Sequence, residues 1–245
     1  MRKITINLAA VAAFCIVVAS PALVSSSCAT PQTEQEDTTI IREDLGITAL
    51  KYSSPEVPSS IEFCGKVIDL SRFDRHERMD RELLAFTYMH STSLQMLKKA
   101  NRYFPIVEPI LKENGIPDDF KYLMVIERNM NPTARSSAGA AGLWQFMQGT
   151  GRDYRLEVNN NVDERYHIEK ATRAACRYLK DAYAKYKDWV AVAASYNAGQ
   201  ARIASQLAKQ DVDDSLDLQL VEETARYVYR ILAAKQLFSA PTTFG

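Results

Sequence analysis

The feature that most constrains the fold is the recurrence of apolar residues at helical spacing, with little strand-like alternation after about position 77. Near the C-terminus, Tyr227, Ile231, Ala234 and Phe238 follow one another at steps of three or four residues, which places them on one helix face. Similar stripes and end signals predict helices over residues 78–102, 105–115, 117–130, 143–148, 168–186, 189–197, 200–209 and 222–238. Only residues 61–70 suit a short extended segment. Helices of this number and length, joined by short loops, predict an all-α domain.

The N-terminal segment has the pattern of a secretory signal. Arg2 and Lys3 precede an apolar run over residues 4–24 that is interrupted by few polar residues. The run is also long enough for an uncleaved membrane anchor, although Pro21 and the small residues after it favour cleavage. We therefore predict an exported protein that resides in the periplasm or is anchored at the outer membrane. The predicted segments are a signal peptide over 1–28, a flexible tether over 29–60, an N-terminal helical extension over 61–116 and a main domain over 117–240.

The cysteines bear on anchoring and on disulfide formation. Cys28 is a candidate lipid attachment site, because residues 25–28 resemble a bacterial lipobox, with Ser25 where a larger aliphatic residue is usual. Cys64 and Cys176 remain in the mature chain. In an oxidising compartment they either form a disulfide or stay as two separate buried thiols, and the sequence leaves both alternatives open.

Composition and histidine placement exclude some kinds of site. The formal net charge is zero and 47% of the residues are hydrophobic, which suits a globular domain and disfavours nucleic-acid binding. His76, His90 and His167 are isolated from the cysteines and from each other, so no metal-ligand spacing is present and no cofactor is expected. His90 falls in an apolar stripe over residues 79–97 and is predicted to be a core histidine.

Glu127 interrupts an apolar helix face. Phe120, Leu123 and Met124 form the stripe, and Glu127 follows Phe120 by seven positions, almost two full turns. Burial and the negative end of the helix dipole both disfavour the charged carboxylate and raise its pKa. This predicts a carboxyl group that is partly protonated near neutral pH, as a general acid requires. The alternative is a glutamate whose head group reaches solvent at the helix end.

The loop after Glu127 suits a ligand that approaches the backbone closely. Residues 139–142 are glycine and alanine, and Trp144, Gln145 and Met147 follow with a flat face, an amide and an adaptable apolar group. A second polar and aromatic cluster lies at 195–199. Such groups typically line a carbohydrate groove, although each of them also fits ordinary packing.

These segments resemble the successive motifs of soluble and membrane-bound lytic transglycosylases. In chain order the matching residues are Glu127, Asn131-Pro132, Ser136, AGA at 138–140, GLWQFM at 142–147, Thr150-Gly151, SYNAG at 195–199, Glu223-Thr224 and Tyr227-Val228. The resemblance covers residues 117–238, about half of the chain. It implies the goose-type lysozyme fold, a lysozyme-like orthogonal helical domain, here with additional N-terminal helices.

The resemblance also implies an activity on peptidoglycan glycan strands. Family members cleave between N-acetylmuramic acid and N-acetylglucosamine with a single catalytic acid, which Glu127 matches. That acid protonates the glycosidic oxygen and then acts as base on the sugar's C6 hydroxyl, which leaves a 1,6-anhydromuramoyl end. The substrate's N-acetyl group replaces the second carboxylate of other glycosidases. Of the remaining matched residues, Ser136, Gln145 and Met147 would line the groove, Tyr196 and Asn197 would lie beside the acid, and Tyr227 would approach it with its hydroxyl.

Three residues depart from the family pattern. Arg128 stands where serine is usual, Gln148 replaces a common proline, and Arg155 replaces a glycine. A guanidinium beside Glu127 would lower the pKa of the acid and oppose its role. Consecutive helical residues point about 100° apart, so Arg128 alternatively faces solvent. Two further functions therefore stay open: a non-catalytic or weakly active peptidoglycan-binding protein, and a hydrolytic muramidase.

Overall fold

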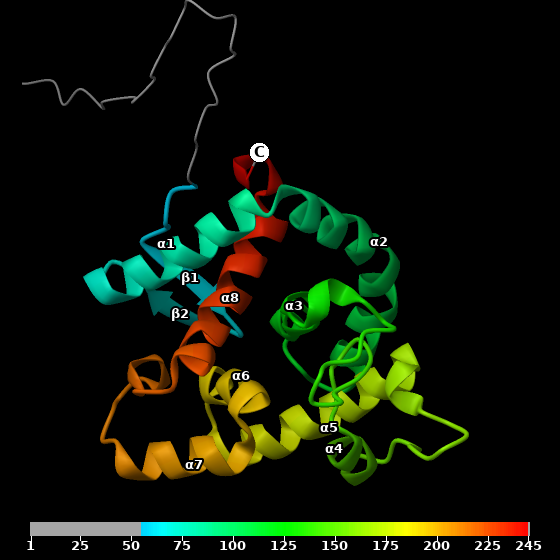
Figure 1. The fold of residues 1–245 in the computed structure, drawn as a ribbon. Helices are drawn as coiled ribbons and strands as arrows, with labels where there is room; N and C mark the ends of the chain where they lie inside the picture. The colour runs from blue at the N-terminus through cyan, green and yellow to red at the C-terminus, as the bar shows by residue number, and fades with distance from the viewer. Residues whose placement is uncertain (1–54, 245) are drawn as a thin grey trace, which may run out of the picture. The chain divides into compact units, whose positions relative to one another are not determined.

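The computed structural model describes residues 55–244, all of which belong to one compact unit (Figure 1). The predicted signal peptide, the lipid attachment site at Cys28 and most of the predicted tether lie outside the described residues. Within residues 55–244, no helix combines the length and the apolar composition needed to cross a bilayer.

The described chain begins with a β-hairpin. Strands β1 (Ser60–Phe63) and β2 (Lys66–Asp69) pair antiparallel, with Ser60 opposite Asp69. Cys64 and Gly65 form the turn with positive φ angles of 54° and 83°, as tight hairpin turns require. The predicted extended segment is therefore confirmed.

The first two helices differ from the prediction of one helix over 78–102. Helix α1 (Phe73–Tyr88) ends at Met89, which leaves helical geometry with φ −93° and ψ 38°, and α2 (His90–Glu113) starts directly after it. The hydroxyl of Ser93 donates to the carbonyl of Phe86 at 2.6 Å and joins the two helices at the break. The prediction that His90 is a core histidine is wrong: the buried stripe stops near Phe86, and His90 is exposed at the start of α2.

Two prolines lie inside α2. The sequence predicts that Pro105 opens a new helix, because proline lacks an N–H and its ring crowds the carbonyl four residues earlier. Instead α2 continues through Pro105 and Pro109 and curves visibly along its length (Figure 1). The predicted end is confirmed, since Gly115 has φ 63° and Ile116 donates its N–H to the Leu111 carbonyl at 3.0 Å.

The remaining elements follow the predicted order. Asp188 caps the helix α6 (Trp189–Ala198) as predicted, because its carboxylate accepts the Val190 N–H at 3.0 Å. The predicted helix over 143–148 is wrong: Gln145 adopts φ 47° in a turn, and helix formation begins later. The α-helices are α3 (Lys121–Ile126), α4 (Gln148–Asp153), α5 (Ile168–Tyr186), α6 (Trp189–Ala198), α7 (Gln200–Lys209) and α8 (Glu222–Ser239). The 3₁₀ helices are η2 (Asp118–Phe120), η3 (Arg128–Met130), η4 (Glu164–Tyr166), η5 (Ser215–Asp217) and η6 (Pro241–Phe244).

Helix α8 is the packing centre of the described unit. It packs against α1, α3 and α6, which surround it in Figure 1, while α5 packs against α2 and α6. Its apolar face is buried as the sequence predicted, with Ile231 and Ala234 fully inaccessible. The all-α prediction, with additional N-terminal helices, is confirmed.

Cys64 and Cys176 are free thiols rather than a disulfide. The backbone N–H of Cys64 donates to Asp119 at 2.7 Å, and burial raises the pKa of the Cys64 thiol far above its ordinary value. Cys176 is fully buried on α5, and burial raises the pKa of its thiol to about 11. Cys64 is partly buried and Cys176 is buried, and the raised pKa of each thiol disfavours the reactive thiolate.

Candidate active site

Glu127 lies at the point where α3 ends. The helix is short and almost wholly buried, and it stops at Ile126. Glu127 itself has an extended backbone, with φ −80° and ψ 104°, and its side chain is half-buried. The predicted apolar face is therefore correct, but Glu127 follows the helix rather than forming part of its last turn.

The carboxyl group of Glu127 receives a hydrogen bond from α8. The hydroxyl of Tyr227, which is 3% exposed, donates to Glu127 Oε1 at 2.7 Å. Burial raises the pKa of Glu127 above its ordinary value, and this effect outweighs the opposing influence of Tyr227, Arg230 and Arg128. Glu223 adds a smaller upward contribution. The direction of the shift agrees with the sequence expectation and favours the protonated form that a general acid needs.

The chain reverses direction directly after Glu127 through three residues with positive φ. Arg128, Asn129 and Met130 have φ angles of 46°, 56° and 51°. Arg128 is exposed, and it lowers the pKa of Glu127 less than Tyr227 or Arg230 does. Of the two alternatives left by the sequence, the structure therefore favours an Arg128 side chain that reaches solvent.

The loop over residues 134–146 is a closely bonded structure. The N–H of Ser136 donates to the Ala140 carbonyl at 2.8 Å, and Ser136 Oγ accepts the Ala140 N–H at 2.9 Å. The Ser136 hydroxyl proton is left available for a ligand. Gly142 has φ 78°, and a Cβ placed on it would lie 1.9 Å from the Arg165 carbonyl oxygen. Only glycine fits this close approach.

The side chain of Arg165 fixes the loop over residues 134–146 by bonding to two of its carbonyl groups. Its guanidinium donates to the carbonyls of Gly139 at 2.8 Å and Phe146 at 3.0 Å. Asp163 holds the same guanidinium through two bonds of 2.9 and 2.7 Å. Arg165 is 5% exposed, so these bonds are protected from water. Residues 152–165 are irregular and polar, so the sequence carries no local signal for the pairing of Arg165 with Asp163.

The three residues from the GLWQFM segment have different environments. Trp144 is fully buried, and its indole N–H donates to Thr172 at 2.9 Å. The expectation that Trp144 offers a flat face to a ligand is wrong, because its ring belongs to the core. The amide nitrogen of Gln145 donates to the carbonyls of Ala134 and Gly142, which leaves its oxygen for a ligand. Met147 is 44% exposed and available for contact.

Tyr196 and Asn197 lie at the C-terminal end of α6. The hydroxyl of Tyr196 donates to the Trp144 carbonyl at 2.8 Å, so α6 also supports the loop. Burial raises the pKa of Tyr196, and the neighbouring charge of Glu127 raises it further. Asn197 accepts a 2.8 Å bond from the Thr224 hydroxyl, which fixes the orientation of its amide.

Three elements therefore converge on Glu127: the end of α3, the end of α6 with Tyr196, and α8 with Tyr227. The loop that carries Ser136, Gln145 and Met147 is joined to this group through Tyr196. Arg230 and Glu223, both on α8, also act on Glu127, and only Glu223 fell within a recognised motif. Across residues 55–244, no cluster of His, Cys, Asp and Glu side chains has the composition of a metal site.

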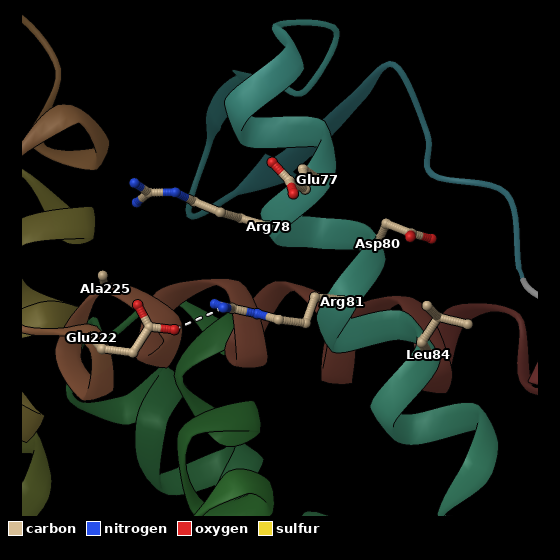
Figure 2. Close-up of a pocket in the computed structure, with 7 residues that line it drawn as sticks. All are labelled: Glu77, Arg78, Asp80, Arg81, Leu84, Glu222 and Ala225. Carbon is tan, nitrogen blue, oxygen red and sulfur yellow. Dashed lines mark hydrogen bonds and ion pairs between the residues drawn. The ribbon is translucent and has the colours of Figure 1, made fainter. Parts of the chain in front are cut away.

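A separate pocket of about 560 Å³ lies between α1 and α8 (Figure 2). Arg81 pairs with Glu222 inside it at 2.7 Å. Close by, the buried carboxylate of Glu82 binds Arg226 at 2.7 Å and holds α1 against α8. No candidate active-site residue lines this pocket. Its lining residues are Glu77, Arg78, Asp80, Arg81, Leu84, Glu222 and Ala225.

Comparisons with known proteins identify the domain that contains this site. Residues 105–217 match the family model of the transglycosylase SLT domain. The chain is 28% identical over 174 residues to membrane-bound lytic murein transglycosylase D of Escherichia coli strain K12, covering 69% of this chain and 38% of that protein. It is 29% identical over 150 residues to membrane-bound lytic murein transglycosylase C of Haemophilus ducreyi, covering 55% and 40%. The chain thus spans less than half the length of these relatives.

A solved structure resembles the chain more distantly. An inactive mutant of lytic transglycosylase Slt from Pseudomonas aeruginosa aligns with a TM-score of 0.49 and 19% identity, over 70% of this chain and 31% of that one. The family match includes Glu127, the loop over 134–146 and the end of α6, whereas α8 with Tyr227 lies beyond it. Residues 105–217, which include Glu127, are therefore similar to the transglycosylase SLT domain.

Proposed function

We propose that this protein is a peptidoglycan lytic transglycosylase that cleaves the glycan strand between N-acetylmuramic acid and N-acetylglucosamine. The observation that carries the proposal is the state of Glu127. This half-buried carboxyl group has a raised pKa, accepts a 2.7 Å hydrogen bond from Tyr227 and lies within the matched SLT domain.

In the first step Glu127 acts as a general acid. Its proton passes to the glycosidic oxygen while the bond from that oxygen to C1 of the muramic acid breaks, and N-acetylglucosamine leaves as an alcohol. Burial raises the pKa of Glu127 and so favours the protonated form before the substrate arrives. The substrate's N-acetyl group stabilises the positive charge at C1, as in the substrate-assisted glycosidases.

In the second step the carboxylate of Glu127 acts as a base. It removes the proton of the muramic acid C6 hydroxyl while that oxygen bonds to C1, which gives the 1,6-anhydro product and restores the protonated acid. Tyr227 donates to the carboxylate formed between the two steps and limits the cost of its buried charge. No water molecule is consumed and no cofactor takes part.

The residues around Glu127 supply the binding groups for the glycan. The free hydroxyl proton of Ser136 and the amide oxygen of Gln145 suit sugar hydroxyl and N-acetyl groups. Met147 offers an exposed apolar contact. Tyr196 and Asn197 border the acid from α6. The partner is therefore the glycan strand of peptidoglycan.

Digestion of purified sacculi followed by mass spectrometry of the products tests this proposal. Wild-type protein should release fragments with 1,6-anhydromuramoyl ends, and Glu127→Gln should release none while it still binds sacculi. Glu169→Gln is the matched control, because Glu169 is an exposed glutamate in the first turn of α5 and has none of the contacts described for Glu127. Reducing ends instead of anhydro ends would identify a hydrolytic muramidase. Binding without release in both wild type and Glu127→Gln would identify a binding protein.

We also infer that the protein is exported and anchored by a lipid at Cys28. The relatives from Escherichia coli and Haemophilus ducreyi are named membrane-bound lytic murein transglycosylases, which is in keeping with an anchor. Metabolic labelling with an alkyne fatty acid should mark the wild-type chain and leave Cys28→Ala unmarked. Equal labelling of both chains would rule out attachment at Cys28.

A further inference from the structure

The backbone directly after Glu127 adopts an unfavourable conformation. Arg128, Asn129 and Met130 all have positive φ, and none of them is glycine. Left-handed backbone brings Cβ close to the carbonyl oxygen in L-residues, so a run of such residues persists only where its surroundings hold it. Asparagine tolerates this region better than most residues, but arginine and methionine gain no such relief.

One hydrogen bond from outside the turn and the burial of its last residue hold the turn in place. The ammonium group of Lys99, on α2, donates to the carbonyl of Asn129, the middle residue, at 2.9 Å. The side chain of Met130 is fully buried and anchors the end of the turn in the core. Inside the turn the backbone bonds are long, with 3.3 Å from the Met130 N–H to the Glu127 carbonyl. Lys99 therefore supplies the one charge-assisted hydrogen bond that the structure gives to this turn.

We propose that Lys99 is a positioning residue: by binding the Asn129 carbonyl it holds the left-handed turn and thereby aims the side chain of Glu127 at Tyr227. This inference rests on the proposed function. Lys99 precedes the matched SLT domain, which begins at residue 105. The N-terminal part of α2 would thus contribute to an active site whose acid lies inside that domain.

The turn adjoins Glu127, so its conformation sets the direction of the carboxyl group. If Arg128 relaxed to negative φ, the peptide after Glu127 would rotate and the 2.7 Å bond to Tyr227 would not persist. Lys99 acts through the backbone rather than as a charge on the carboxylate. The charged and titratable neighbours that shift the pKa of Glu127 are three residues of α8 and one of the turn: Tyr227, Arg230, Glu223 and Arg128. Glu127 itself raises the pKa of Tyr196 on α6.

Four variants test the proposal. Lys99→Met removes the donor and keeps the length of the side chain, Lys99→Arg restores a donor, and Lys98→Met is the matched control at an exposed neighbour. The fourth, Arg128→Gly, is combined with Lys99→Met and relieves strain at φ 46°. On solubilised glycan strands Lys99→Met should lower kcat about tenfold or more and change KM less than about twofold, since a misaimed acid impairs chemistry rather than binding.

The other variants separate positioning from general damage. Lys99→Arg should retain at least half of the wild-type kcat, Lys98→Met should match wild type, and the double variant should recover several-fold over Lys99→Met. A kcat for Lys99→Met within twofold of wild type would overturn the proposal. So would a double variant no better than Lys99→Met alone.

A second measurement does not depend on activity. The Glu127 carboxyl can be titrated by ¹³C NMR in glutamate-labelled protein and assigned with Glu127→Gln. In Lys99→Met the midpoint should fall toward the ordinary glutamate value, because a carboxyl group that swings away loses the burial that raises its pKa. An unchanged midpoint would overturn the positioning role. If wild-type protein fails to cleave sacculi, the proposed function fails, and this titration still decides the role of Lys99.

Discussion

The hydroxyl of Tyr227 lies 2.7 Å from Oε1 of Glu127 and joins two residues that are 100 positions apart. Glu127 follows α3, inside the SLT domain, whereas Tyr227 belongs to α8, beyond it. The hydrogen bond favours the ionised carboxylate, and burial opposes it more strongly. The pKa of Glu127 therefore depends on how α8 packs against α3.

Tyr227→Phe should raise the pKa of Glu127 further, because it removes a donor that stabilises the charged form. A general acid must be protonated, so the alkaline limb of the pH profile of kcat/KM should move to higher pH. The rate at the optimum should fall roughly 10- to 100-fold, the loss expected for one hydrogen bond to a charged group. Rates measured across pH 4–9 test both effects.

Tyr229→Phe is the matched control for this experiment. Tyr229 is equally buried on α8, but Arg78 and Arg75 rather than Glu127 are its charged neighbours. Its substitution should leave the position of the alkaline limb unchanged. If Tyr227→Phe also left the alkaline limb of the kcat/KM profile at the wild-type pH, the role given to Tyr227 would be contradicted.

Glu127→Gln should stabilise the protein at alkaline pH. The native pKa of Glu127 lies above its unfolded value, so the contribution of the glutamate to stability is greatest at low pH and is lost as pH rises through the native pKa. The neutral amide avoids this loss and still accepts the Tyr227 hydroxyl. Thermal unfolding should show a Tm about 2–4 °C above wild type at pH 8. At pH 4 the two proteins should unfold together, and a stabilisation that is equal at both pH values would show that ionisation is not its cause.

Arg128→Ser should have a small effect, despite the position of Arg128 beside the acid. Arg128 is exposed, so solvent and salt screen its charge from Glu127. We expect kcat/KM to change less than about threefold, with the difference shrinking further between 20 and 300 mM salt. A tenfold or larger gain would instead show that the arginine restrains the enzyme.

The helices α5 to α8 were predictable because their own residues carry the required signals. Each has a sequence-local apolar pattern or end signal, and Asp188 marks the start of α6. The sequence around the helix break at Met89 contains no glycine or proline, so no local sequence signal predicts the break. Conversely, Pro105 suggested a helix start that tertiary packing overrides inside α2.

The candidate site was only partly predictable, because some of its features have local sequence signals and others depend on distant segments. The raised pKa of Glu127 follows from an acid at the end of an apolar helix, which the sequence displays. The positive φ angles of residues 128–130 have no glycine to signal them. Arg165 acts on carbonyls 19 and 26 positions away, and Trp144 enters the core rather than the groove. These features depend on contacts between distant segments, which a single sequence does not display.

Gly142→Ala should destabilise the protein and inactivate it together. The added Cβ would lie 1.9 Å from the Arg165 carbonyl oxygen, which is backbone and has little freedom to move. The positive φ of 78° adds strain for alanine. Steric overlap of this kind, together with left-handed strain, is expected to cost about 2–4 kcal/mol in the free energy of unfolding. Urea denaturation measures that loss of stability. Sacculus digestion measures the loss of activity that is expected when the loop carrying Ser136 and Gln145 is displaced.

Two other glycines separate the two causes. Gly139 has φ 91° with open space around it, so Gly139→Ala should incur only the backbone strain, about 1 kcal/mol. Gly149 has neither a positive φ nor a close neighbour, and it lies in α4, so Gly149→Ala should be neutral or stabilise by up to about 1 kcal/mol. The predicted order, from the most to the least stable variant, is therefore Gly149→Ala, Gly139→Ala and Gly142→Ala. If Gly142→Ala were no worse than Gly139→Ala, the loop over 134–146 would not be held tightly against the Arg165 backbone, contrary to the bonds that Arg165 makes to Gly139 and Phe146.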